Sequence, residues 1–211
     1  MNILQKKRIV LYILLQIKKL VYLCENTIRN MKRYLIIIDA QNDFIDGALG
    51  TKEAQQAVPE ILHQIQNWNW DNIIVTQDTH HADYLETREG KLLPVPHCIE
   101  GTEGWLVKSD ILRSIYNKIK CIKFIHKETF GSLELPAYLQ EHEGIETHEK
   151  DVEFHFMGFC TDICVVSNVL ILKAVFPEAD FFVHADCCAG VTPEKHQHAL
   201  DTMASCQVQI I

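Results

Sequence analysis

Cys164 is the residue of this chain best placed for nucleophilic chemistry. It belongs to the segment GFCTDICV, which follows the apolar run 152–157, an expected buried strand. We expect Gly158 to open a turn and Thr161 to favour a helix start, so that Cys164 lies about one turn into the helix. Unpaired N–H groups and the helix dipole favour a thiolate there, the form that attacks carbonyl carbons. Because a single cysteine in an apolar helix is more often a packing residue, this segment alone leaves both interpretations open.

Two charged residues follow other apolar runs and could serve such a thiol. Asp39 comes directly after the run 34–38, and a carboxylate at the end of a buried strand is desolvated, which raises its pKa and suits it to exchange protons. Lys127 stands at the end of a third run, where its positive charge could stabilise a nearby thiolate. The ordinary alternatives are a turn cap, which we prefer for Asp43, and a solvated lysine.

A metal site is indicated by a second group of polar residues. Asp78 and His80 are two residues apart after the run 73–76, and the loop that follows can bring His97 back to them. Oxygen and imidazole ligands without a thiolate suit Zn²⁺, Fe²⁺ or Mn²⁺, and spacing does not choose among these ions. The pair Asp78-x-His80 is a weak signal when taken alone.

The elements that must position these residues are apolar strand-like runs that alternate with helix-like segments from Lys32 onward. Such alternation, with strands apolar on both faces, predicts a single doubly wound α/β fold with a mainly parallel six-stranded sheet and helices on both faces. Ligands of such sheets bind beyond the carboxyl ends of the strands, where the polar residues above are found. The expected strands are 34–38, 73–76, 121–125, 152–157, 181–184 and 207–211, and the expected helices are 52–67, 111–118, 133–141, 161–176 and 193–204.

Composition narrows the class of protein. A chain of 211 residues with 47% hydrophobic content can bury one sizeable core and is short for two domains. The net charge of -8 argues against a nucleic-acid partner, whose phosphates need a basic face, and favours a small-molecule substrate. The eight cysteines include no CxxC metal pair and no regular disulfide spacing, which favours a reducing cytoplasm.

Residues 1–30 are predicted to be an N-terminal extension that is not part of the folded domain 31–211. A basic triplet at 6–8 precedes the apolar stretch 9–17, but Lys18 and Lys19 interrupt it before it reaches membrane-spanning length. We therefore expect no stable membrane insertion. An amphipathic surface helix remains an alternative for this stretch.

Together, these segments resemble the isochorismatase-like cysteine hydrolases, and the resemblance covers nearly all of residues 32–211. It extends to the segment DCCAGVTPE at 186–194 and to the last expected strand. The matching segments are DxQNDF with Asp39, Asp78-x-His80, Pro96-His97-Cys98, Lys127 ahead of TFGS, and GxxTDxCV with Cys164.

The resemblance implies a catalytic triad in which Asp39 accepts and donates protons, Lys127 is the electrostatic partner and Cys164 is the nucleophile. It also implies a cis peptide bond between Phe159 and Cys160. The N–H groups of Cys160 and Cys164 would then form an oxyanion hole for the substrate oxygen.

Within this superfamily the residues Asp78, His80 and His97 resemble the nicotinamidase branch, which implies one divalent metal ion. The fourth ligand of that branch is a His or Glu of the intervening loop. It falls on Glu89 if the loop is aligned on EGKL, and on Glu86 if it is counted forward from His80. We favour Glu89.

The resemblance also suggests the residues of the substrate pocket. Phe44 matches the family's aromatic residue after the first strand, whereas Leu93 and Pro94 replace the aromatic residue often found before the last metal ligand. A ring face for the substrate could come instead from one of several aromatic residues, of which we select Phe130 and Phe159 to join Phe44. The candidates are Phe130, Phe159, Tyr84 and Trp105.

The function implied is metal-assisted cysteine amidohydrolysis of a small carboxamide, with nicotinamide cleaved to nicotinate and ammonia through a thioester. The alternatives are hydrolysis of another amide, hydrolysis of an isochorismate-like vinyl ether without the thiol, and a non-catalytic relative that binds a metal or ligand. The set of Asp39, Lys127 and Cys164 argues against the last, because no binding protein needs all three. Analogy with the family predicts a cytoplasmic homo-oligomer.

Overall fold

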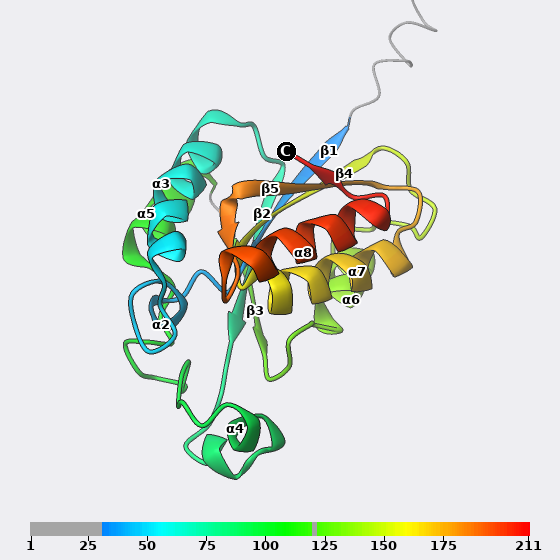
Figure 1. The fold of residues 1–211 in the computed structure, drawn as a ribbon. Helices are drawn as coiled ribbons and strands as arrows, with labels where there is room; N and C mark the ends of the chain where they lie inside the picture. The colour runs from blue at the N-terminus through cyan, green and yellow to red at the C-terminus, as the bar shows by residue number, and fades with distance from the viewer. Residues whose placement is uncertain (1–30, 120–121) are drawn as a thin grey trace, which may run out of the picture. The chain divides into compact units, whose positions relative to one another are not determined.

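Six parallel strands form the centre of the protein, in the order β3-β2-β1-β4-β5-β6 (Figure 1). The computed structural model describes residues 31–119 and 122–211. The predictions for residues 1–30 and for the start of the third strand at Cys121 lie outside the described residues. The strands are β1 (Lys32–Ile38), β2 (Asn72–Asp78), β3 (Ile122–Lys127), β4 (Val152–Phe159), β5 (Asp180–Ala189) and β6 (Gln209–Ile210).

The strand order contains a switch point between β1 and β4, where the chain stops adding strands on one side of β1 and starts adding them on the other. β1 pairs with β2 on one side and with β4 on the other, both in parallel register. The chain runs outward to β3 and then returns to β4, so the crossovers leave a crevice beyond the carboxyl ends of β1 and β4, which is where ligands of such sheets bind. Asp39 follows the first of these strands and Cys160 the second.

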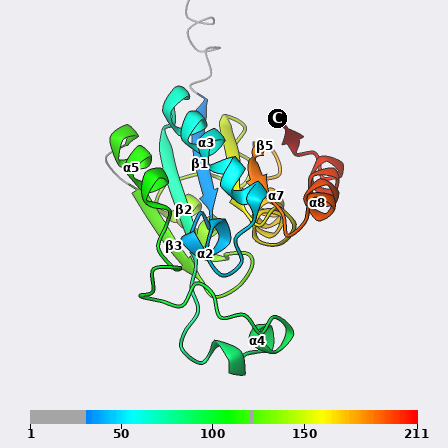
Figure 2. The same ribbon diagram turned by 60° about the vertical axis from the view of Figure 1, so that its left-hand side comes forward.

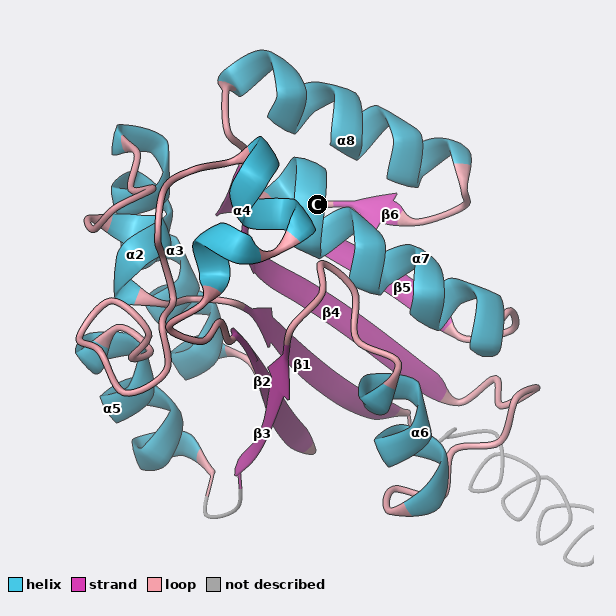
Figure 3. Ribbon diagram, turned by 90° about the horizontal axis from the view of Figure 1, so that it is seen from below, coloured by secondary structure: helices cyan, strands magenta, loops and turns pink. Residues whose placement is uncertain are grey.

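Helices cover both faces of the sheet, which confirms the doubly wound α/β fold. In Figures 2 and 3, α3 and α5 lie on one face, and α6, α7 and α8 lie on the other. The helices are α2 (Asn42–Ile45), α3 (Lys52–Asn67), the 3₁₀ helix η1 (Tyr84–Glu86), α4 (Arg88–Leu92), α5 (Ser109–Lys118), α6 (Glu134–Glu141), the π-helical turn η2 (Thr161–Val165), α7 (Val166–Val175) and α8 (Pro193–Ser205). None in the described part of the chain has the length and apolarity to cross a membrane.

The apolar pattern of the sequence predicted these elements because the apolar residues of each pattern are the ones buried in the core. The four core residues of α3 are spaced by three or four positions, so they form one stripe against the sheet, and α3 matches the predicted helix 52–67. They are Ala54, Ala57, Ile61 and Ile65. Short elements without such a period, namely α2, η1 and α4, were not predicted.

The prediction that Gly158 opens a turn is wrong, because β4 continues through it to Phe159. Gly158 has a φ of +127°, and any Cβ there would overlap the carbonyl oxygen of Ile38 on β1. Glycine is therefore needed for a close approach of two strands, at a point where the register with β5 shifts. The predicted helix 161–176 is likewise divided, since its first turn is the π-helical η2 and α7 ends at Val175.

Candidate active site

A cavity of about 750 Å³ opens at the carboxyl end of the sheet. Most of the predicted site residues line it, and they come from the carboxyl ends of four strands and from the segments that follow them. The predicted residues in its wall are Phe44, Asp78, His80, Glu89, His97, Phe130, Phe159, Cys160 and Cys164. Asp39 and Lys127 are buried beside it, with 0% and 4% of their surfaces exposed.

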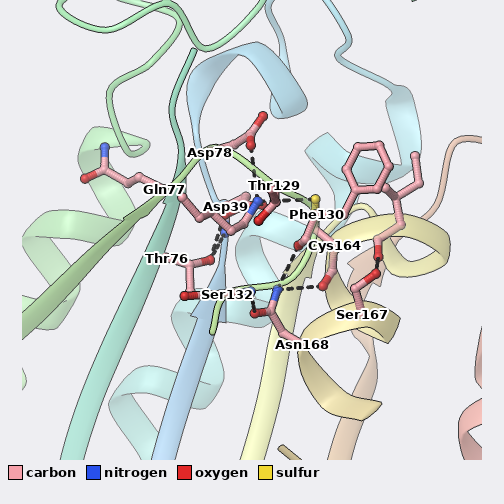
Figure 4. Close-up of polar contacts among 12 residues, drawn as sticks. Asp39, Thr76, Gln77, Asp78, Thr129, Phe130, Ser132, Cys164, Ser167 and Asn168 are labelled. Atoms are coloured by element: carbon pink, nitrogen blue, oxygen red, sulfur yellow. Dashed lines mark hydrogen bonds and ion pairs between the residues drawn. The ribbon is translucent and has the colours of Figure 1, made fainter. Parts of the chain in front are cut away.

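Lys127 is the centre of the polar contacts. Its Nζ atom lies 2.6 Å from Asp39 Oδ2, 3.2 Å from Asp78 Oδ1 and 3.5 Å from Cys164 Sγ. Figure 4 shows the side chains of Asp39, Asp78 and Cys164 converging on one region. The structure therefore brings together Asp39, Lys127 and Cys164, which are far apart in the sequence.

Two residues that the sequence did not single out hold this group in place. Thr76 donates its hydroxyl to Asp39 Oδ1 at 2.6 Å, which fixes the carboxylate on the side opposite Lys127. The Asn168 side chain donates to the carbonyl oxygen of Cys164 at 2.8 Å and accepts from the N–H of Ser132 at 2.9 Å. Neither belongs to a segment quoted for the family resemblance, so no local signal marked them.

The expectation that the helix start makes Cys164 a ready thiolate is wrong for this structure. Burial raises the pKa of the Cys164 thiol well above its usual range, the nearby Asp39 carboxylate adds to this, and the Lys127 ammonium opposes it. Burial and the Asp39 carboxylate therefore both disfavour a charged sulfur at this position. The resting group is thus a thiol that needs a proton acceptor.

The two partners of the thiol have pKa values that suit such a transfer. Burial raises the pKa of Asp39, although the Lys127 ammonium and the Thr76 hydroxyl oppose the change. Burial alone would lower the pKa of Lys127, but the charges around it, led by Asp39, raise it well above the usual value. Lys127 therefore remains an ammonium, and the raised pKa of Asp39 makes this carboxylate a better proton acceptor than an exposed one.

Asp78, His80 and His97 form a group that could hold a metal ion, since their ligand atoms all lie within 4.8 Å of one another. The Oδ2 atom of Asp78 is 3.0 Å from His80 Nε2 and 3.5 Å from His97 Nε2. Ligands placed about 2.1 Å from a common ion are about 3.0 to 3.4 Å apart, so these separations fit a first coordination sphere.

Two further observations fit an ion at this position. The buried Nε2 atom of His80 is not satisfied by a hydrogen bond among the described residues, although Asp78 Oδ2 lies 3.0 Å away. His97 Nδ1 lies 2.9 Å from the carbonyl oxygen of Val95, which can only accept, so Nδ1 carries the proton and the Nε2 lone pair is free to coordinate.

Of the two glutamates considered as a fourth ligand, Glu89 is the nearer. Its Oε1 atom lies 3.7 Å from His80 Nε2 and 3.9 Å from His97 Nε2, whereas Glu86 is exposed and is absent from the cavity wall among the described residues. Glu89 lies in α4, whose first residues are capped by the Thr87 hydroxyl.

The aromatic residues divide into three groups. Phe44 and Phe159 are buried in the wall, and Phe130 is 47% exposed at the cavity. Tyr84 also lines the cavity, with its ring centroid 4.7 Å from that of His80. Trp105 does not belong to the cavity wall: its indole N–H donates to the Thr79 hydroxyl at 2.9 Å, so it cannot provide the expected ring face.

The peptide bond between Phe159 and Cys160 is cis, as predicted. It lies directly before η2, whose fourth residue is Cys164. Cys160 precedes this short turn and Cys164 lies within it, and both line the cavity.

With this geometry established, comparison with known proteins gives the family. A model of the isochorismatase domain matches residues 33–211. The chain belongs to the isochorismatase family. The isochorismatase family protein PncA of Bacillus subtilis is 28% identical over 186 residues, which cover 83% of this chain and 96% of that protein.

Two further comparisons are with proteins whose names give an activity. A nicotinamidase of Schizosaccharomyces pombe is 22% identical over 209 residues, covering 84% of this chain and 91% of that protein. The crystal structure of the nicotinamidase/pyrazinamidase PncA from Bacillus subtilis has a TM-score of 0.71 and 30% identity, and it covers 85% of this chain and 99% of its own.

Proposed function

We propose that this protein is a metal-assisted cysteine amidohydrolase that converts nicotinamide to nicotinate and ammonia. It is a hydrolase of the isochorismatase family that acts on amides, in keeping with its nicotinamidase relatives. The observation that carries the finer proposal is the placement of one ammonium, Lys127, within 2.6 Å of Asp39, 3.2 Å of Asp78 and 3.5 Å of Cys164. Lys127 thus contacts the thiol of Cys164, the base Asp39 and the candidate metal ligand Asp78 at the same time.

Acylation begins with proton transfer. Asp39 takes the proton of the Cys164 thiol, and the new thiolate attacks the carboxamide carbon. The N–H groups of Cys160 and Cys164 receive the oxyanion in our proposal. When the tetrahedral species collapses, the C–N bond breaks, Asp39 gives its proton to the leaving nitrogen, and ammonia departs from a thioester on Cys164.

Deacylation uses the same residues in reverse order. Asp39, again unprotonated, takes a proton from water, whose oxygen attacks the thioester carbon. The C–S bond breaks, the carboxylic acid is released, and the sulfur recovers its proton from Asp39. Lys127 remains charged throughout, since its carboxylate neighbours raise its pKa well above the usual value.

Asp78, His80 and His97 would hold a divalent ion of zinc, iron or manganese, with Glu89 as a further ligand. When bound, the ion would fix the ring nitrogen of the substrate and so orient the carboxamide toward Cys164. Phe44, whose ring centroid lies 5.6 Å from that of His97, and Phe130 would pack against the heteroaromatic ring in the same cavity.

The alternative functions would need fewer of these residues. A relative that cleaves an isochorismate-like vinyl ether would not need the thiol, and a metal- or ligand-binding relative would not need the buried Asp39 and Lys127. We propose a cytoplasmic enzyme that acts on a small molecule as a homo-oligomer and does not bind nucleic acid. The described cysteines are all free, which suits a reducing compartment.

Ammonia release measured over a panel of carboxamides, including nicotinamide, pyrazinamide, benzamide and a linear amide, tests the proposal. We expect the highest kcat/KM for nicotinamide, a loss on treatment with chelator, and recovery when Zn²⁺, Fe²⁺ or Mn²⁺ is added back. Full activity of a protein shown to be metal-free would exclude the metal-assisted reaction. Turnover of a vinyl ether by a Cys164→Ala variant would favour the isochorismatase-like alternative.

A further inference from the structure

We infer that Gln41 is a positioning residue that locks the backbone of Asp78, so that this one carboxylate can serve both the metal position and Lys127. The inference rests on the metal site of the proposed function. Gln41 belongs to the DxQNDF segment, where only the two aspartates and the phenylalanine had been given roles.

The Gln41 side chain pairs with Asp78 as a neighbouring strand would. Its Nε2 donates to the carbonyl oxygen of Asp78 at 2.8 Å, and the Asp78 N–H donates to its Oε1 at 2.8 Å. The second Nε2 hydrogen donates to the carbonyl oxygen of Trp105 at 2.8 Å. Gln41 is 0% exposed, so the whole amide is buried and hydrogen-bonded.

This pairing occurs where the sheet stops supporting Asp78 on one side. The register of β1 with β2 ends at Ile38 opposite Thr76, two residues before Asp78. Beyond it the chain turns away at Asp39, which has a φ of +47°. β3 still pairs with β2 at Asp78, but on the β1 side the Gln41 amide replaces the missing strand.

The position of Asp78 matters because its two oxygens have different neighbours. Oδ2 lies 3.0 Å from His80 Nε2 and faces the candidate ion, whereas Oδ1 lies 3.2 Å from Lys127 Nζ. A backbone shift of about 1 Å would break one set of contacts or the other. Gln41 therefore controls the geometry of the ion ligands and, through Lys127, that of Asp39 and Cys164.

Gln77 provides a matched control. It is also a buried glutamine at this edge of the sheet, 6% exposed, and its Nε2 donates to the same Trp105 carbonyl oxygen at 3.2 Å. Its side chain makes that contact without pairing to the Asp78 backbone. Replacing either glutamine by methionine removes a buried amide of similar size, but only Gln41→Met removes the support of Asp78.

The experiment measures the affinity of the full chain for Zn²⁺ alone by competition with a chromogenic chelator, and thermal unfolding of the metal-free proteins in parallel. We expect Gln41→Met to weaken Zn²⁺ binding by about 10 to 100-fold, as removal of an outer-sphere support does, while Gln77→Met stays within about threefold of the wild type. Gln41→Glu keeps the acceptor for the Asp78 N–H but loses both donors. It should also bind Zn²⁺ more weakly, and it is the variant to use if Gln41→Met does not fold.

Two results would overturn the inference. One is wild-type Zn²⁺ affinity in the Gln41 variants. The other is an equal loss of affinity in Gln41→Met and Gln77→Met that follows their loss of thermal stability, because a general effect on folding would explain it. If the wild type itself binds no Zn²⁺, Fe²⁺ or Mn²⁺, the metal site of the proposed function fails, and the inference fails with it. The two failures can be told apart, because the metal site is tested on the wild type alone and the role of Gln41 is tested on the variants.

Discussion

Two regions of the sheet bury ionisable side chains, but one keeps them charged and the other keeps them neutral. At the carboxyl end, Asp39 and Lys127 lie 2.6 Å apart with almost no exposure. In the middle of β4 and β5, His155 and His184 are 1% and 3% exposed, with His155 Nδ1 3.1 Å from His184 Nε2. Both imidazole rings lie at a steep angle to the ring of Trp68, with centroids 5.1 and 5.9 Å from it.

The environment of each pair determines whether it is charged. Burial, with a smaller contribution from the neighbouring His155, lowers the pKa of His184 to about 4. Burial also lowers the pKa of His155, although Glu153 opposes this. An aromatic enclosure thus keeps two imidazoles neutral, whereas opposite charges at close range keep Lys127 ionised. Burial alone removes charge, and a charge persists only where a partner of the opposite sign is placed beside it.

Loss of the nucleophile should give the largest effect on the charged region. Cys164→Ala deletes one sulfur and no backbone feature, so we expect kcat/KM for amide hydrolysis to fall by about 10⁴-fold or more with the fold intact. Initial rates of ammonia release and the circular dichroism spectrum provide the measurement. Cys160→Ala is the control and should be mild, because Cys160 is proposed to act through its N–H. Comparable losses from both substitutions would mean that the nucleophile is misplaced.

A smaller effect is expected when the positive charge of the pair is removed. Lys127 lowers the pKa of Cys164 against the stronger effects of burial and Asp39. Lys127→Met should therefore move the curve of iodoacetamide alkylation against pH to the alkaline side. Mass spectrometry of the Cys164 peptide gives this curve in a background where the other accessible cysteines are replaced.

Lys127→Arg separates charge from shape in the same assay. It should keep much of the wild-type alkylation curve but lose turnover, because a planar guanidinium does not fit the space of a compact ammonium. Superimposable curves for the wild type and Lys127→Met would show that Lys127 does not control the thiol. The proposed triad would then lack its second member.

In the neutral region the expected effect is on stability and not on reactivity. The pKa of His184 falls from 6.5 in the unfolded chain to about 4 in the fold, so between these values the unfolded chain binds a proton that the folded chain does not. The free energy of unfolding should fall as pH decreases through this window, and the contribution of His184 is present above pH 6.5. Between pH 7 and pH 4.5 this contribution amounts to about 2–3 kcal/mol.

Urea unfolding at several pH values tests this by comparing how the free energy of unfolding changes with pH in the wild type and in a His184 variant. His184→Gln keeps a neutral polar side chain, so its stability should decline less than that of the wild type between pH 7 and pH 4.5. His63→Gln, which changes an exposed histidine of α3, should decline as the wild type does. An unchanged pH dependence in His184→Gln would mean that the imidazole is not held neutral by the fold, and the contrast between the two regions would be lost.

Much of the architecture follows from patterns that are local in the sequence. The helix expected at about 52–67 coincides with α3, in which Thr51 caps the first turn and four apolar residues form one stripe. The buried strands were predicted within a few residues, apart from β5, which runs on to Ala189. The polar residues that follow these strands were assigned correctly to one edge of the sheet, since parallel strands have their carboxyl ends at the same edge.

What the sequence by itself determined is therefore the doubly wound sheet, the family and the identities of the candidate site residues, because apolar periodicity and short motifs depend on neighbours along the chain. Only the tertiary structure decided how these residues act on one another. The close approach of Gly158 to Ile38, the support of Asp78 by Gln41 and the raised pKa of Cys164 all depend on groups far away in sequence. Desolvation and pairing depend on the distances between atoms of different strands, and the folded chain alone sets those distances.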